Sequence, residues 1–83
     1  MRLFIANLLH STTEDQVWAA FEQFGEVTDV RFARDRETGA FRCFCFVTMA
    51  HEPDALQAIE QLHGSTWGGR VLHVEPARAK TAA

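Results

Sequence analysis

A chain of 83 residues is long enough for one small domain with a single modest core. Its hydrophobic fraction of 47%, with seven phenylalanines, is enough to fold it without disulfides or metals. No apolar run reaches the ~20 residues that a membrane-spanning helix needs, so we expect no membrane association. The net charge of −3 argues at first against a nucleic-acid ligand, because proteins that bind nucleic acids are often basic.

The chain starts with a predicted strand over residues 2–7. Side chains alternate between the two faces of a strand, so if Leu3 and Ile5 point into the core, Phe4 points outward. The apolar run is too short for a signal peptide, and residues typical of a helix start follow it.

A first helix is predicted over residues 13–24. Thr13 and Gln16 form the pattern of a capping box at its start, and Gly25 is placed to end it. Three large apolar residues recur at helical spacing and indicate its buried side: Val17, Phe21 and Phe24.

A hairpin of two strands is predicted next. Val30 and Phe32 alternate in the second strand, and the polar turn at 35–39 precedes a third strand over 42–49. In the third strand, one face would carry Arg42, Phe44 and Phe46. The opposite face would carry Cys43, Cys45, Val47 and Met49.

A second helix and a last strand complete the chain. Pro53 fits the first turn of a helix over 53–63, which Gly64 ends. The buried side of this helix would consist of Ala55, Ala58, Ile59 and Leu62. After Gly68 and Gly69, the last strand would turn Leu72 and Val74 to the core and Val71, His73 and Glu75 outward.

Two β-α-β units joined through a hairpin predict an α+β sandwich. Its sheet would be antiparallel and four-stranded, with both helices on one face and the other face open. In this topology the two strands that carry phenylalanines can be neighbours. An open face with aromatic rings and an arginine can stack flat bases and attract phosphate, which is the basis of single-stranded nucleic-acid binding.

The distribution of charge supports this interpretation better than the net charge does. All eight basic residues lie outside the two predicted helices, which contain no Lys or Arg. Five acidic residues lie on the helices: Glu14, Asp15, Glu22, Asp54 and Glu60. We therefore expect an acidic helical side and a more basic surface around the sheet.

The sequence resembles the RNA recognition motif (RRM) family over essentially its whole length. Residues 3–8 are similar to the family's ribonucleoprotein hexapeptide, and residues 42–49 are similar to its octapeptide, K/R-G-F/Y-G/A-F-V-x-F/Y. The resemblance implies a ferredoxin-like βαββαβ fold that binds single-stranded RNA, with no catalysis and no cofactor. It assigns residues 1–77 to the RRM domain and 78–83 to a short flexible tail.

The family resemblance also implies roles for particular side chains. Phe4 and Phe44 would each stack a base, Phe46 would pack against a sugar or between two nucleotides, and Arg42 would contact phosphate. Four more residues are candidates for RNA contact, two by strand parity and two from the tail: Arg31, His73, Arg78 and Lys80.

The octapeptide departs from the family pattern on the face predicted to pack against the helices. Cys43 replaces a glycine, Cys45 a glycine or alanine, and Met49 an aromatic residue. A lone C-x-C is neither a zinc pattern nor a disulfide geometry, so we expect two buried, reduced thiols, no metal and a cytoplasmic location.

Other functions on the same architecture fit the sequence less well. A protein-binding module would use the acidic helical face, but residues 67–71 lack the Arg-x-Phe motif of such relatives. The side of Trp18 and Leu56 remains a candidate for a weak protein partner or a dimer. An acylphosphatase-like enzyme would need an arginine in residues 8–13, and a metal carrier would need C-x-x-C there; both are absent.

The first strand follows Met1 directly, which suggests a stand-alone protein, with an excised domain as the alternative.

Overall fold

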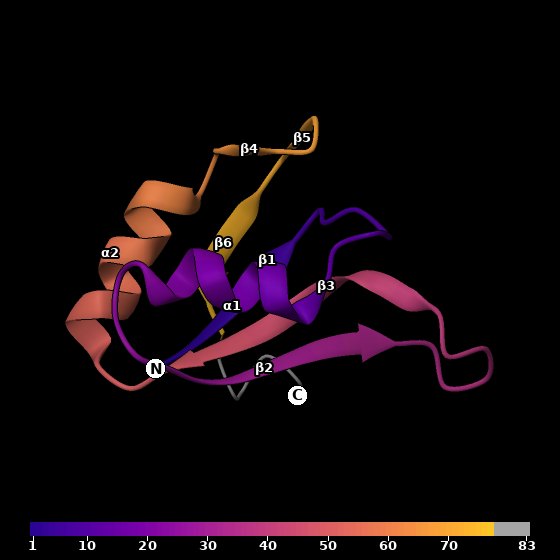
Figure 1. The fold of residues 1–83 in the computed structure, drawn as a ribbon, viewed down its shortest axis with the longest axis horizontal. Coiled ribbons are helices and arrows are strands. Elements are labelled where there is room, and N and C mark those ends of the chain that lie inside the picture. Colours follow the sequence, from indigo (N-terminus) through magenta and orange to yellow (C-terminus); the bar gives the residue numbers. More distant parts are fainter. Residues whose placement is uncertain (78–83) are drawn as a thin grey trace.

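The computed structural model describes residues 1–77 and confirms the predicted α+β fold. Its elements follow in the order β1 (Arg2–Ala6), α1 (Glu14–Glu22), β2 (Val27–Arg34), β3 (Phe41–Met49), α2 (Glu52–Leu62), β4 (Thr66–Trp67), β5 (Arg70–Val71) and β6 (His73–Pro76). The main sheet is antiparallel with the strand order β2-β3-β1-β6. Both helices lie on one side of this sheet (Figure 1). The predicted tail, 78–83, is outside the described residues.

The hydrophobic core fills the space between the helices and the sheet. Leu3 and Ile5 of β1 are fully buried, as the alternation predicted, and Phe4 between them is only half-buried. Leu72 and Val74 close the core from the last part of the chain. Because the described residues include no buried polar or charged side chain, burial of apolar surface dominates the stability of this domain.

Helix α1 starts with the predicted capping box. The Gln16 backbone N–H donates to Thr13 Oγ1 over 3.2 Å, and the Thr13 N–H donates to Gln16 Oε1 over 3.0 Å. The helix ends at Glu22, two residues before the predicted end, because the chain tightens into i→i−3 hydrogen bonds there. Gly25 follows where the chain passes α2: a Cβ at this position would lie only 2.2 Å from Asp54 Oδ2.

A small hairpin, β4–β5, was not predicted. Thr66 pairs with Val71 and Trp67 with Arg70, which leaves Gly68 and Gly69 as a two-residue turn. Both glycines have positive φ angles, +56° and +88°, as a tight hairpin turn of this kind requires. The prediction that Val71 lies on the open face of the main sheet is therefore wrong, because Val71 belongs to this separate hairpin.

The third strand is irregular at Cys43. Phe32 pairs with Cys45 and Arg34 with Phe41, so β3 uses three residues, 42–44, where β2 uses one. Cys43 adopts a left-handed conformation with φ +66°, and its carbonyl accepts a hydrogen bond from the Leu8 N–H. The strict alternation that we expected fails here, and Cys43 is half-buried instead of buried.

Cys45 is buried, as the sequence analysis predicted for both cysteines. Its side chain is fully buried, and this desolvation raises the pKa of the thiol to about 12. Both cysteines are free in the structure, so each side chain acts as a small apolar group in or beside the core.

Replacing Cys43 by glycine is expected to leave the domain as stable or to stabilise it by up to ~1 kcal/mol. A left-handed conformation costs a residue with a Cβ about 1–2 kcal/mol, whereas the added freedom of glycine in the unfolded chain costs roughly 0.5–1 kcal/mol. Thermal unfolding would show this as an unchanged midpoint or a rise of about 4–8 °C.

Cys45→Gly is the matched control, because it removes the same atoms from a residue with ordinary backbone angles. It should destabilise the domain by roughly 2 kcal/mol through the cavity that it leaves in the core. Equal destabilisation by both substitutions would contradict the role assigned to the Cys43 backbone.

Candidate nucleic-acid interface

Three phenylalanines form an aromatic cluster on the sheet face opposite the helices: Phe4, Phe44 and Phe46. Phe4 pairs with Phe46 across β1 and β3. The Phe4 ring centroid lies 5.5 Å from that of Phe44 and 5.6 Å from that of Phe46. The rings are tilted against one another instead of stacked, and all three are half-buried, so a flat ligand can still reach a ring face.

Two arginines lie over this cluster. The Arg2 guanidinium carbon is 4.4 Å from the centre of the Phe46 ring, and that of Arg42 is 5.7 Å from the centre of the Phe44 ring. Both distances fit cation–π contacts. Sequence reasoning selected Arg42 but missed Arg2, although Arg2 shares the strand parity of Phe4 and could have been found by it.

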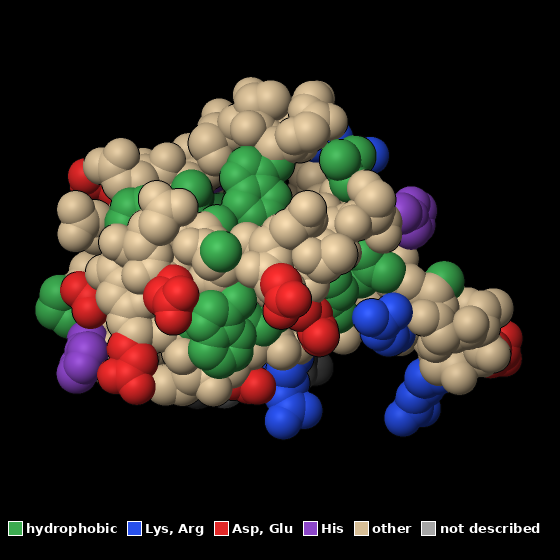
Figure 2. Space-filling model, in the orientation of Figure 1, with side chains coloured by type: hydrophobic (Ala, Val, Ile, Leu, Met, Phe, Trp, Pro, Cys, Tyr) green, Lys and Arg blue, Asp and Glu red, His purple; other side chains and the backbone are tan. Residues whose placement is uncertain are grey.

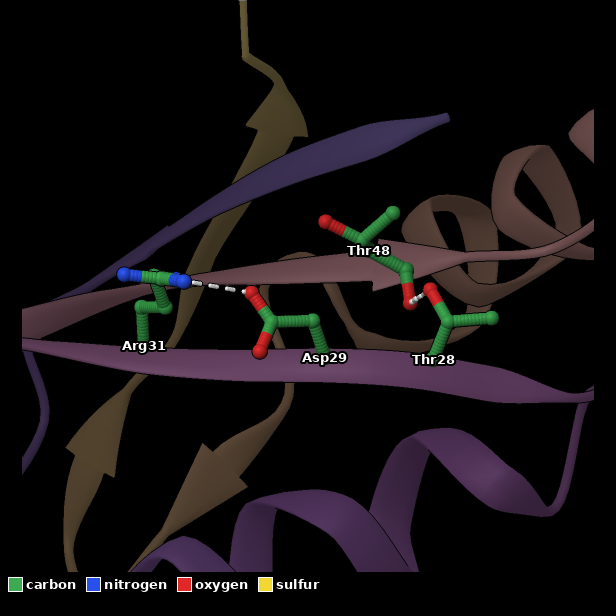
Figure 3. A network of polar contacts seen from close by, with 4 residues as sticks. All are labelled: Thr28, Asp29, Arg31 and Thr48. Atoms are coloured by element: carbon green, nitrogen blue, oxygen red, sulfur yellow. Dashed lines mark hydrogen bonds and ion pairs between the residues drawn. The ribbon is translucent and has the colours of Figure 1, made fainter.

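Arg31 lies beside the cluster on β2, opposite Phe46 of β3. Its Nε donates to Asp29 Oδ2 over 3.0 Å, and Figure 3 shows both side chains on the side of the sheet away from α1. The arginine side chain is 73% exposed, and an exposed ion pair contributes only about 0–1 kcal/mol, so a phosphate can compete for the guanidinium. Asp29 nevertheless offsets the charge of Arg31, and the sequence analysis did not anticipate this ion pair.

The last strand, β6, adds His73 and Glu75 to the same face. In the pairing with β1, Glu75 lies opposite Phe4 and His73 opposite Ala6. His73 Nε2 is in hydrogen-bond contact with Glu75 Oε2. The predicted position of His73 is thus correct, and Glu75 is a neighbour of the cluster that the sequence analysis did not select.

Asn7, at the end of β1, has a structural role in the loops. Its Nδ2 donates to the Val71 carbonyl over 2.7 Å, and its Oδ1 accepts from Arg70 Nη2 over 2.7 Å. Asn7 also has a positive φ angle of +70°, which asparagine tolerates better than most residues. Because these bonds use both ends of the amide, Asn7 fixes β1 against the β4–β5 hairpin.

The helical face is acidic, as predicted. Figure 2 shows acidic side chains gathered around apolar ones on this face, with Lys and Arg side chains at its margin. The two helices carry six acidic residues, one more than expected because α2 begins at Glu52: Glu14, Asp15, Glu22, Glu52, Asp54 and Glu60. Trp18 and Leu56 are 36% and 49% exposed on the helices.

Neither a metal site nor a membrane-spanning helix is found within residues 1–77. They contain no group of three or more His, Cys, Asp or Glu placed to hold a metal ion. None of their helices is long and apolar enough to cross a membrane. The candidate contacts Arg78 and Lys80 lie outside these residues, so the structure does not place them.

The chain is similar to known proteins both in sequence and in structure. The family model of the RNA recognition motif matches residues 3–73. The "Putative RNA-binding protein RbpE" of Nostoc sp. is 41% identical over 80 residues, which is 96% of this chain and 81% of the relative. The crystal structure of RNA binding protein PG1 superposes with a TM-score of 0.90 at 40% identity and covers 93% of both chains.

A structure described as an Sxl-lethal protein/RNA complex has a TM-score of 0.88 at 31% identity, covering 93% of this chain and 46% of that one. The hexapeptide and octapeptide expected from the sequence thus occupy adjacent strands, β1 and β3, within a matching fold and a matching family model. The chain belongs to the RNA recognition motif family.

Proposed function

We propose that this protein binds single-stranded RNA across the open face of the main sheet, without catalysis and without a cofactor. The observation that carries the proposal is the aromatic cluster with Arg2 and Arg42 over its rings. Aromatic faces stack bases of any identity, and guanidinium groups bind phosphate oxygens. RNA as the ligand is supported by the structurally similar protein that is described as a protein/RNA complex.

Each ring has a distinct part in this proposal. Phe4 and Phe44 each stack one base, and Phe46 packs against a sugar or between two nucleotides. Arg42 contacts the phosphate backbone, and Arg2 and Arg31 lie on the same face to do so as well. Stacking contributes about 1–3 kcal/mol per base, so two stacked bases supply roughly 2–6 kcal/mol of the binding free energy.

The charge distribution favours this face over the helical one. The acidic side chains of α1 and α2 repel phosphate, whereas the sheet face presents arginines. Since few positive charges assist the rings, we expect a moderate affinity, on the order of micromolar. A cytoplasmic location belongs to the same proposal, because the two free thiols suit a reducing compartment.

Residue-by-residue chemical shifts on titration with pools of short single-stranded RNA test this proposal. The backbone amides of β1 and β3, and the amides next to the three rings, should shift in a saturable way. The amides of α1 and α2 should stay nearly unchanged. Shifts confined to the helices, or no saturable shift with any pool, would overturn the proposal.

A further inference from the structure

A carboxylate stands beside the aromatic cluster, on a face expected to receive a polyanion. Glu75 lies directly opposite Phe4 across β6 and β1, so the two side chains extend from the same face of neighbouring strands. Directly opposed side chains in a sheet have Cβ atoms about 5 Å apart. A base stacked on the Phe4 ring would therefore present one edge to Glu75, whose side chain is 51% exposed.

The neighbours of Glu75 hold this carboxylate in place. His73 Nε2 contacts Glu75 Oε2. The His73 ring in turn meets the His63 ring edge-on, with centroids 5.0 Å apart. His63 Nδ1 accepts the Val74 backbone N–H over 3.0 Å, which ties the C-terminal end of α2 to the outer edge of β6. The carboxylate is thus supported by a chain of two rings anchored to the backbone.

The second carboxylate of this face is engaged differently. Asp29 is paired with Arg31, so its charge is already balanced by a guanidinium on its own strand. Within the described residues, Glu75 has no arginine or lysine partner, and its Oε1 accepts no hydrogen bond. An ionised carboxylate only accepts hydrogen bonds. It therefore repels a nearby phosphate and binds a ligand that offers N–H donors.

We propose that Glu75 recognises the base stacked on Phe4 and selects guanine, a preference that rests on the function proposed above. The Watson–Crick edge of guanine carries two adjacent donors, the N1–H and the 2-amino group, which match the two oxygens of a carboxylate. Uracil presents a single N–H between two carbonyl oxygens, and these oxygens face the carboxylate unfavourably. A good bidentate pair is worth about 1–3 kcal/mol of discrimination between bases.

The test uses three eight-nucleotide RNAs: oligouridine, oligouridine with one central guanine, and the same RNA with inosine, which lacks the 2-amino group, in place of guanine. The unchanged protein should bind the guanine RNA about 5- to 150-fold more tightly than oligouridine, with inosine between them. In Glu75→Gln the ratio of the affinities for the guanine and inosine RNAs should fall to about one. The N–H₂ group of the glutamine amide would face the N–H donors of guanine, and two donors cannot form a hydrogen bond with each other.

Glu60→Gln is the matched control, since it removes the same charge from an exposed position on α2. It should keep the full guanine preference. If the unchanged protein binds all three RNAs equally, or if Glu75→Gln keeps the preference, the assignment to Glu75 is overturned while the RNA-binding function stands. If none of the RNAs binds the unchanged protein, the RNA-binding function itself fails.

Discussion

Replacing Phe44 by alanine is expected to weaken the binding of single-stranded RNA by about five-fold to a hundred-fold. The substitution removes one stacking surface, and such a surface is worth about 1–3 kcal/mol per base. Phe4→Ala should have a similar effect, because the Phe4 ring lies at the centre of the cluster, within 5.6 Å of both others. Fluorescence anisotropy with a labelled short RNA measures the change.

Stability and specificity controls separate lost stacking from lost folding. Both rings are only half-buried, so the variants should retain their secondary structure and a cooperative thermal transition. Trp18→Ala is the matched control, because it removes an exposed aromatic side chain from the helical face. It should leave the affinity for RNA unchanged. Two folded phenylalanine variants with unaltered affinity would exclude the aromatic cluster as the binding site.

The affinity for RNA is expected to fall with salt along a shallow slope. Each phosphate neutralised on a single strand contributes about −0.7 to the slope of log K against log salt, so roughly 2–4 contacts give a slope on the order of −1 to −3. Between 50 and 200 mM salt, such slopes reduce the affinity by about 4- to 60-fold. Arg42→Ala should weaken binding to all sequences and flatten the slope by roughly one contact, and Arg2→Ala should act in the same direction.

Charge-removing variants of the helical face distinguish RNA binding from the protein-binding alternative. The double variant Glu14→Gln and Asp15→Asn removes two negative charges from the first turn of α1. It should leave the salt slope for RNA unchanged, because the helical face contributes no phosphate contact. A protein ligand docked on the acidic helices would reverse this pattern. If only the helix variants lose binding, the sheet face is not the functional surface.

The sequence by itself determined the two helices, the four strands of the main sheet and the face on which the phenylalanines lie. Helical spacing located the buried sides of α1 and α2, and the capping box at Thr13 located the start of α1 to the residue. Alternation in β1 placed Leu3 and Ile5 inside and Phe4 outside. These features are predictable because they depend on the periodicity of one segment, which is a local property of the chain.

Only the tertiary structure decided which side chains from different segments meet. The pairing of β1 with β6 brings Glu75 opposite Phe4, and the contact of Arg2 with the Phe46 ring joins residues 44 positions apart. Strand alternation predicted that Cys43 is buried, but the irregular register of β3 leaves it only half-buried. The Cys43 carbonyl accepts a hydrogen bond from the N–H of Leu8, which lies beyond the end of β1. Such outcomes depend on the register between distant strands. Periodicity within one strand determines which side chains face the core, but it leaves open which residue of a distant strand lies opposite each of them.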